Sequence, residues 1–312
     1  MLSSVKAYAP ATVANVSCGF DILGFAIDAM GDTVELVLKD EPGLVVVSIE
    51  GDGGKLPLEA EKNTCAVAIQ AMLDELDSNV GMNIYLTKGL PLGSGMGSSA
   101  ASAVAALAAA NRLLGDPFEK KDLLPFAIAA EKVACGAGHA DNVAPSLLGG
   151  FVLVRDYHPL DVIKLPVPNG LYCTLLHPHY ELKTADSRSV LRDQIPMKHA
   201  TIQSGNVAGL IAGLYESDFE LISRSLRDVI AEPYRAVLLP GFYEVREALK
   251  AAGALGMGIS GSGPTLFALS RGKEIAEAVG EAGKEMFSKI GLGVDVYFSE
   301  INTRGAYVIE EK

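Results

Sequence analysis

The chain has 312 residues, enough for one large or two moderate domains, and 49% of them are apolar, so a substantial core is expected. Its formal net charge of −12 argues against broad binding to nucleic acids or anionic membranes, although a local pocket can still attract an anion. Because no apolar run has the length of a transmembrane helix and the N-terminus lacks a signal-peptide pattern, we expect a cytoplasmic protein.

The first half of the chain is predicted to mix short strands with helices. Apolar alternation and β-branched residues indicate strands at residues 5–8, 33–38, 44–49, 82–87 and 149–154. Helices are expected at residues 63–76, 100–114 and 120–133. The second of these helices is rich in alanine, which has the highest helix propensity, and Gly115 with Pro117 is expected to end it.

The second half shows a similar mixture. Strands are predicted at residues 171–176 and 294–299, with a strand, a glycine-rich turn and a second strand across 256–270. Helices are predicted at residues 208–214, 218–230, 242–252 and 275–290. Because the elements do not alternate strictly, a doubly wound parallel sheet is not expected. A domain boundary is placed near residue 160, in the segment His158-Pro-Leu.

The segment Pro91-Leu-Gly-Ser-Gly-Met-Gly-Ser-Ser, just before the alanine-rich helix, is the strongest functional signal. Its alternate glycines allow positive φ angles and close approach to a ligand. Ser98 and Ser99 stand where the helix begins, and the free N–H groups of a helix N-terminus bind phosphate. No G-K-[ST] follows, so the loop is not a Walker A motif, and its spacing does not fit a Rossmann fingerprint. A flexible loop with a serine N-cap is the simpler alternative.

This loop resembles the phosphate loop of the GHMP kinases, whose pattern is P-x-x-x-G-L/M-G-S-S-A. Seven residues match the pattern in order, namely Pro91, Gly95, Met96, Gly97, Ser98, Ser99 and Ala100. The resemblance implies that ATP is bound by this loop and its flanks, with Asn63 near the adenine as a weaker analogy. The implied ATP-binding residues are Asn63, Lys88, Pro91, Leu92, Gly93, Ser94, Gly95, Met96, Gly97, Ser98, Ser99, Ala100 and Ala101.

Other segments resemble the homoserine kinases within this superfamily, over nearly the whole chain. The stretch that begins Tyr8-Ala-Pro-Ala-Thr-Val-Ala-Asn is similar to their A-P-A-T-x-A-N-x-G-x-G-F-D start, with Ser17 replacing the usual glycine. The resemblance implies that Asn15 and Asp21 contact L-homoserine. Asp21 can bind the substrate ammonium and Asn15 can orient its hydroxyl. A loop in which Asn and Asp only form turns is the alternative.

The segment from Glu131 to Gly150 is similar to a further motif of these kinases. The resemblance makes Glu131 the carboxylate that binds Mg²⁺, with Ser99 as a candidate second ligand. Magnesium in kinases usually has few protein ligands, and phosphates and water supply the others. His139 and Asp141 resemble residues of the substrate pocket. Without the motif, a single glutamate on a helix would be read as a solvated surface residue.

The residue at position 142 bears on the mechanism. Mevalonate-kinase-like members have a catalytic aspartate seven residues before the glycine pair of this segment, and the corresponding residue here is Asn142. An amide cannot act as a general base. We therefore hypothesise that Asn15 and Asn142 position the hydroxyl, with Ser98 at the phosphates, while the proton passes to a phosphate oxygen. Asp141 is the alternative base.

Two arginines complete the expected substrate site. The stretch Lys183-Thr-Ala-Asp-Ser-Arg-Ser-Val-Leu is similar to the family pattern T-x-x-x-R-x-x-L, which assigns Thr184 and Arg188 to the substrate. Arg235 follows in Glu232-Pro-Tyr-Arg, and two arginines suit one α-carboxylate, opposite Asp21 for the ammonium. Taken singly, each arginine is more often a surface ion-pair residue. The glycine-rich stretch from Gly256 resembles the third motif of the superfamily, which packs against the nucleotide loop.

The resemblance implies an α+β fold with a ribosomal-S5-like N-terminal, ATP-binding domain at 1–160 and a ferredoxin-like C-terminal domain at 161–312. It implies ATP:L-homoserine O-phosphotransferase activity with Mg²⁺, in threonine biosynthesis. The expected partners are L-homoserine and ATP, without nucleic acid or membrane, and a homodimer stays open.

Three alternative functions make different demands on the sequence. A sugar or mevalonate kinase predicts an aspartate at position 142 and no amino-acid clamp. A non-catalytic nucleotide-binding regulator predicts loss of Glu131 or of the phosphate loop. A nucleic-acid-binding module on the same type of domain predicts a basic surface.

Overall fold

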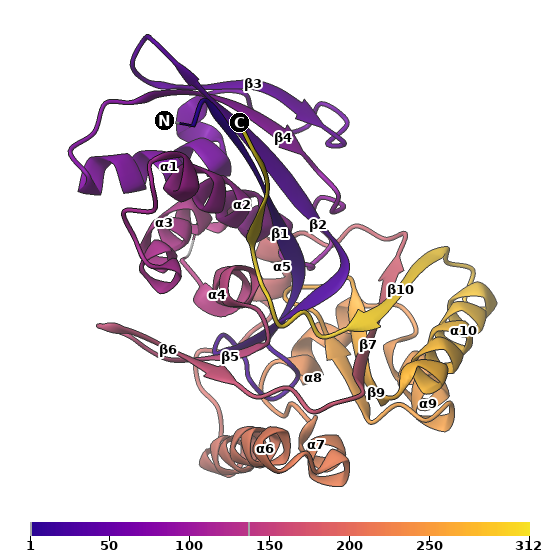
Figure 1. Cartoon of the computed structure of the whole chain (residues 1–312). Helices are drawn as coiled ribbons and strands as arrows, with labels where there is room; N and C mark the ends of the chain where they lie inside the picture. The colour runs from indigo at the N-terminus through magenta and orange to yellow at the C-terminus, as the bar shows by residue number, and fades with distance from the viewer. Residues whose placement is uncertain (1, 137) are drawn as a thin grey trace.

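The structure is a computed structural model that describes residues 2–136 and 138–312, apart from the side chains of residues 134 and 135. Two β-sheets organise the described residues, and their strands can be followed in Figure 1. The first sheet has seven strands, with β11-β1-β2-β4-β3 in order, β5 paired to β2 and β6 paired to β5. Its strands are β1 (Ser4–Ala14), β2 (Leu23–Lys39), β3 (Leu44–Glu50), β4 (Gly81–Thr87), β5 (Phe151–Tyr157), β6 (Leu160–Leu165) and β11 (Tyr307–Glu311).

Four helices cover one part of this sheet (Figure 1). They are α1 (Thr64–Glu75), α2 (Ser98–Leu113), α3 (Leu124–Cys135) and α4 (Ala140–Leu148). The alanines of α2 are buried almost without exception, because their small side chains let the helix pack closely against β1, β2 and the other three helices. The alanine-rich sequence therefore sets both the helix and its central place in the core.

The second sheet has the order β10-β7-β9-β8, and every neighbouring pair is antiparallel. Its strands are β7 (Leu171–Pro178), β8 (Gly256–Ile259), β9 (Leu266–Arg271) and β10 (Val294–Glu300). The helices of this half are α5 (Thr184–Ser189), α6 (Met197–Glu216), α7 (Phe219–Ser225), α8 (Glu232–Arg235), α9 (Phe242–Ala251) and α10 (Lys273–Lys289). Short 3₁₀ helices lie at Ala60–Lys62, Lys120–Leu123 and Ala236–Leu238. The two-sheet α+β architecture expected from the sequence is confirmed.

Several elements differ from the sequence-based predictions. The first two strands are longer than predicted, since β1 and β2 pair from Ser4↔Val37 to Ala14↔Gly24 along most of their length. Helix α4 was missed, because it is short and contains Pro145, which normally argues against a helix. The helix predicted at 218–230 ends at Ser225, and a loop held by Asp228 follows.

The proposed domain boundary near residue 160 falls in the turn between β5 and β6. These two strands pair with each other in the first sheet, and β11 returns from the C-terminus to pair with β1. The two ends of the chain therefore lie together, and Ser3 N donates to Lys312 O at 2.7 Å (Figure 1). We propose that the N-terminal domain extends through β6 and includes β11, with the segment between them forming the second domain.

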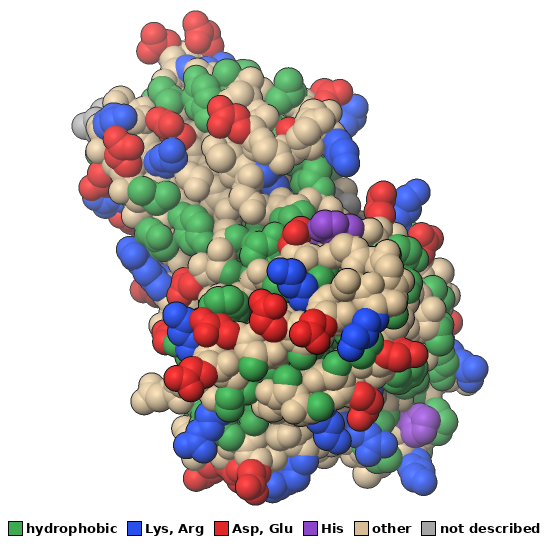
Figure 2. All heavy atoms as spheres, turned by 90° about the vertical axis from the view of Figure 1, so that its right-hand side faces the viewer, with side chains coloured by type: hydrophobic (Ala, Val, Ile, Leu, Met, Phe, Trp, Pro, Cys, Tyr) green, Lys and Arg blue, Asp and Glu red, His purple; other side chains and the backbone are tan. Residues whose placement is uncertain are grey.

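Charged side chains of both signs are interspersed over the face shown in Figure 2, with no large basic area. Among the described residues, none of the helices combines the length and the apolar character needed to span a membrane.

Candidate functional site

A cavity of about 480 Å³ gathers most of the residues that the sequence predicted for the site. Its lining comes from the β1–β2 connection, the loop before α2, and the helices α3, α4, α5 and α8. The predicted residues on its wall are Asn15, Asp21, Asn63, Lys88, Leu92, Gly93, Ser94, Gly95, Gly97, Ser98, Ser99, Glu131, His139, Asp141, Asn142, Thr184, Arg188 and Arg235. Pro91, Met96, Ala100 and Ala101 do not line it.

The phosphate loop reaches the start of α2 through glycines in the left-handed region. Gly93, Gly95 and Gly97 have φ angles of 66°, 80° and 69°, and Gly97 is the N-cap of α2 without a side-chain cap. The first amides of a helix have no partner within it, so the helix start presents N–H groups to the cavity. Ala101 N already donates to Gly97 O at 2.9 Å, which removes it from the residues that bind phosphate through their amides.

Ser98 and Ser99 do not cap the helix and both line the cavity. The hydroxyl of Ser98 is buried and has no hydrogen-bond partner among the described residues. A buried hydroxyl without a partner costs free energy, so a ligand oxygen at this point would stabilise the arrangement. The two serines are therefore available to a bound phosphate or its cation.

The third glycine-rich motif packs on the phosphate loop, as the sequence predicted. Ser260 Oγ donates to Gly95 O at 2.7 Å, and Thr265 N donates to Ser94 O at 3.3 Å. A Cβ atom on Gly95 would lie 2.5 Å from Ser260 O and 2.7 Å from Gly263 O. Close backbone contact explains why glycine occupies this position.

Replacing Gly95 with alanine should displace the phosphate loop. The left-handed backbone costs an alanine about 1–2 kcal/mol, and the added methyl also collides with the backbone of the 260–263 turn. Gly115→Ala is the matched control, since Gly115 has a φ of 84° and open space around a Cβ atom. We expect KM for ATP to rise about 10-fold or more in Gly95→Ala alone, and equal values in the two variants would contradict this account.

Lys88 was predicted to bind ATP, and in the structure its ammonium is bonded within the protein. Its side chain is 1% exposed, and its ammonium pairs with Asp32, donates to Ser98 O at 2.8 Å and donates to Ser102 Oγ at 2.9 Å. An ammonium has three hydrogens, and these contacts occupy all of them. The prediction of direct phosphate binding is therefore not supported by this geometry.

Asp21 and Arg188 meet directly at the other end of the cavity. Arg188 Nη2 donates to Asp21 Oδ1 at 3.1 Å, and His139 Nδ1 lies 3.7 Å from Asp21 Oδ2. The two residues were expected to face opposite ends of the substrate, and in the structure they are also neighbours of opposite charge. A guanidinium has five N–H donors and a carboxylate accepts several hydrogen bonds, so each group retains capacity for a further partner.

Asn15 and Arg235 converge on one carbonyl. Asn15 Nδ2 donates to Gly261 O at 2.7 Å and Arg235 Nη1 donates to the same oxygen at 3.1 Å. Asn15 Oδ1 also accepts from Asp21 N at 3.0 Å. The Asn15 amide therefore shapes the loop that carries Asp21, and this is a different task from the predicted orientation of a hydroxyl.

Arg235 is only 3% exposed, and burial lowers the pKa of its guanidinium. Its Nε donates to Ser187 O at 3.1 Å, and its guanidinium carbon lies 5.1 Å from the centre of the Phe20 ring. These contacts and the hydrogen bond to Gly261 O hold the arginine at the cavity wall. Thr184 Oγ1 and Ser262 Oγ, which also line the cavity, are 3.1 Å apart.

Asp141 and Asn142 both lie in the first turn of α4. Burial, followed by the negative charge of Asp21, raises the pKa of Asp141 to about 7. The side-chain oxygen of Asn142 accepts from Thr12 Oγ1 at 2.7 Å, which leaves its Nδ2 pointing away from Thr12 as a donor. Burial also lowers the pKa of His139.

Glu131 lies on α3, is 6% exposed, and lines the same cavity as Ser98 and Ser99. Asn63 was predicted to lie near the adenine, and in the structure its Oδ1 caps α1 by accepting a hydrogen bond from Cys65 N at 3.0 Å.

Eight further residues line the cavity and were not predicted: Leu56, Pro57, Lys62, Thr64, Ser102, Val133, Gly261 and Ser262. Thr12, which orients Asn142, could have been identified from the sequence because it belongs to the A-P-A-T motif. The apolar lining residues Leu56, Pro57 and Val133 belong to no motif that would have indicated them.

Comparison with known proteins places these features in a family. The model of the GHMP kinases N terminal domain matches residues 63–150, and that of the GHMP kinases C terminal domain matches residues 210–289. A homoserine kinase of Chlorobium phaeobacteroides is 52% identical over 320 residues, covering 99% of this chain and 100% of that protein. One from Xylella fastidiosa is 40% identical, covering 97% of this chain and 94% of that protein.

Solved structures agree with this assignment. The crystal structure of homoserine kinase from Cytophaga hutchinsonii superposes with a TM-score of 0.96 at 56% identity, covering 99% of this chain and 98% of that one. The match extends over both sheets and over the segments that form the cavity, because almost no part of either chain is left out. The chain therefore belongs to the homoserine kinase family of the GHMP kinases.

Proposed function

We propose that this protein transfers the γ-phosphoryl group of ATP to the side-chain hydroxyl of L-homoserine, giving ADP and O-phospho-L-homoserine. The observation that carries the proposal is a single cavity that joins the phosphate loop to Asp21, Arg188 and Arg235. The loop and the helix start suit the phosphates of ATP. The acidic and basic side chains suit the ammonium and carboxylate of an amino acid.

We propose that Glu131 and Ser99 hold Mg²⁺. A buried carboxylate and two serine hydroxyls, one of them without a hydrogen-bond partner among the described residues, share one wall of the cavity and fit a cation that prefers oxygen ligands. When bound with ATP, the ion neutralises charge on the β- and γ-phosphates.

In the proposed mechanism the chain acts by positioning and by fixed charge. The amides at the start of α2 and Ser98 hold the phosphates, while Asp21, Arg188 and Arg235 hold the amino acid. Asn142, oriented by Thr12, donates toward the acceptor hydroxyl. The hydroxyl oxygen attacks the γ-phosphorus, the bond to the β-phosphate oxygen breaks, and the hydroxyl proton passes to a γ-phosphate oxygen.

The role of Asp141 can be tested by pH. With a pKa of about 7, its carboxyl is mostly protonated at pH 6 and mostly ionised at pH 8. If it were the general base, single-turnover rates would rise through pH 7, and Asp141→Asn would abolish this rise and slow the chemistry by about 100-fold or more. We expect Asp141→Asn to keep the single-turnover rate at saturating homoserine within about 10-fold and to act mainly on KM for homoserine. Loss of chemistry with homoserine still bound would instead make Asp141 the base.

The function itself is tested by coupled ADP release with homoserine, serine, threonine, mevalonate and galactose as acceptors. We expect turnover with homoserine to exceed that with mevalonate and galactose, which lack the ammonium. Absence of turnover with homoserine, together with activity on another acceptor, would contradict the substrate while keeping the kinase assignment.

The working form of the protein is also a proposal. A cytoplasmic location is supported by the dependence on ATP, which is made and kept inside cells. Independence from nucleic acid and membranes is supported by the net charge of −12 and by the interspersed charges of Figure 2. A homodimer is the assembly that we propose to test, by light scattering.

A further inference from the structure

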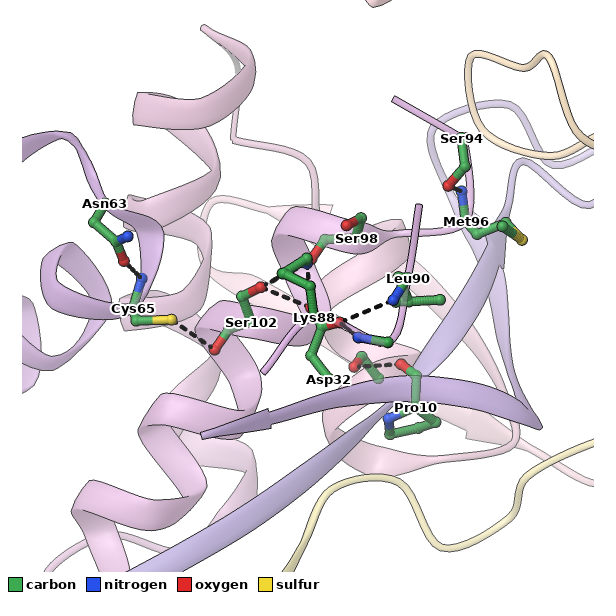
Figure 3. Close-up of polar contacts among 12 residues, drawn as sticks. Pro10, Asp32, Asn63, Cys65, Lys88, Leu90, Ser94, Met96, Ser98 and Ser102 are labelled. Carbon is green, nitrogen blue, oxygen red and sulfur yellow. Dashed lines mark hydrogen bonds and ion pairs between the residues drawn. The ribbon is translucent and has the colours of Figure 1, made fainter. Parts of the chain in front are cut away.

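A buried network of three side chains lies beneath the phosphate loop (Figure 3). Asp32 comes from β2, Lys88 follows the last residue of β4, and Ser102 stands one turn into α2. Lys88 forms an ion pair with Asp32 in which the two side chains are 1% and 0% exposed. Ser102 Oγ accepts from Lys88 Nζ at 2.9 Å and donates to Asp32 Oδ2 at 2.7 Å.

The network holds both ends of the loop. At the start, Asp32 Oδ1 accepts from Gly89 N at 3.0 Å and from Leu90 N at 3.3 Å. At the end, Lys88 Nζ donates to Ser98 O, the carbonyl of the first residue of α2, at 2.8 Å. The ion pair joins these two attachments. The ion pair thus links the amides just before the loop to the carbonyl at the start of α2.

Stability alone does not account for such a pair. Removing two charges from water costs several kcal/mol per ion, and well-packed apolar residues in the same space are often equally or more stabilising. Each oxygen and each hydrogen of this network is instead directed at a backbone group of the loop or at a member of the network. Low exposure also strengthens these contacts, so the arrangement is rigid before any ligand binds.

We propose that Asp32, Lys88 and Ser102 are positioning residues that hold the phosphate loop in its nucleotide-binding form before ATP arrives. The proposal rests on the proposed function, since it concerns how that site receives its nucleotide. Phosphate binding by backbone amides requires that several N–H groups converge on one point. If folding already orders these groups, the conformational entropy of ordering them is not lost when the nucleotide binds. Lys88 acts through the loop and does not touch the nucleotide.

The alternative is that Lys88 turns toward a phosphate when ATP binds. The two roles differ in what Asp32 does. If Lys88 contacts the phosphate, Asp32→Asn frees the ammonium from its counter-ion, and nucleotide affinity stays equal or increases. If the network positions the loop, Asp32→Asn and Lys88→Met each break the same ion pair, so both lower the affinity for the nucleotide. The double variant then binds the nucleotide no more weakly than the weaker-binding single variant, because the ion pair is already lost in each single variant.

The experiment measures Kd for a fluorescent N-methylanthraniloyl ADP by titration of the full chain, without an acceptor. The variants are Asp32→Asn, Lys88→Met, the double variant and Ser102→Ala. Thr174→Val is the control, because Thr174 Oγ1 also donates from a buried position to a helix carbonyl, Ala276 O at 2.8 Å, but lies in the second sheet. Hydrogen exchange of residues 89–98 and KM for homoserine are measured in parallel.

We expect Kd for the labelled ADP to rise about 10-fold or more in Asp32→Asn and in Lys88→Met, and about 3-fold or more in Ser102→Ala. The Kd of the double variant should lie within about 3-fold of that of the weaker-binding single variant. Exchange at 89–98 should increase in the same variants, while KM for homoserine and the Thr174→Val values stay near wild type. Unchanged or tighter binding in Asp32→Asn would overturn the proposal, as would an equal loss in Thr174→Val.

Ser102→Ala keeps the proposal open to refutation if a charge variant fails to fold. The variant retains the ion pair and loses only the bridging hydroxyl, so unchanged Kd and unchanged exchange at 89–98 would also overturn the proposal. Because the titration needs no acceptor, its outcome is independent of whether wild-type protein phosphorylates homoserine, and that turnover is measured separately.

Discussion

Replacing Glu131 with glutamine is expected to lower kcat by about 100- to 1000-fold, the range found when one preorganised electrostatic contact is lost from a transition state. Glutamine preserves the size of the side chain but lacks the negative charge, so a divalent cation loses its protein carboxylate. The residue is buried at the wall that also carries Ser98 and Ser99, and water cannot easily replace it. Steady-state rates over a magnesium titration provide the measurement.

Two further results separate this role from a structural one. Binding of ADP in the presence of a chelator should be little changed in Glu131→Gln, because no cation takes part. Glu75→Gln, on the exposed end of α1, is the control and should behave as wild type. Wild-type turnover with an unchanged magnesium dependence in Glu131→Gln would remove the residue from the proposed cation site.

Asp21→Asn is expected to raise KM for homoserine by about 100-fold while KM for ATP stays near the wild-type value. The aspartate is the carboxylate in contact with Arg188 and His139, and its loss leaves the substrate ammonium without a counter-charge. A 100-fold change corresponds to about 2.7 kcal/mol, which is near the lower end of the cost of removing one partner from a buried, hydrogen-bonded charge pair. Initial rates over both substrates provide the two values.

The substrate can be changed together with the protein. 4-Hydroxybutanoate lacks the ammonium, so wild-type protein should discriminate strongly against it, and Asp21→Asn should lose most of this discrimination. Asp186→Asn, an exposed change on the same short helix as Arg188, is the matched control. If Asp21→Asn still preferred homoserine as strongly as wild type, the ammonium would have to be bound elsewhere.

Two contacts between site residues went beyond what the residue types indicate. Asp21 and Arg188 were both predicted as substrate residues, and the structure adds a hydrogen-bonded contact between them across 167 positions of the chain. The resemblance placed Lys88 among the ATP-binding residues, and residue types gave no indication of its contact with Asp32. Asp32 carried no sequence signal, since a single aspartate just before a predicted strand is not distinguished from a surface residue.

Residue types alone were enough to predict the features that depend on local backbone physics. Alternate glycines before an alanine-rich helix predicted a loop of positive φ angles that ends in free helix amides, and the structure has both, because these features are encoded within a few residues. The motifs around Asn15, Glu131 and Arg188 were sufficient to identify the family. Which charges meet follows from the fold, because Lys88 and Asp32 are 56 positions apart and are brought together by the pairing of β2 with β4. Long-range contacts of this kind depend on register and packing, and neither can be read from residue types alone.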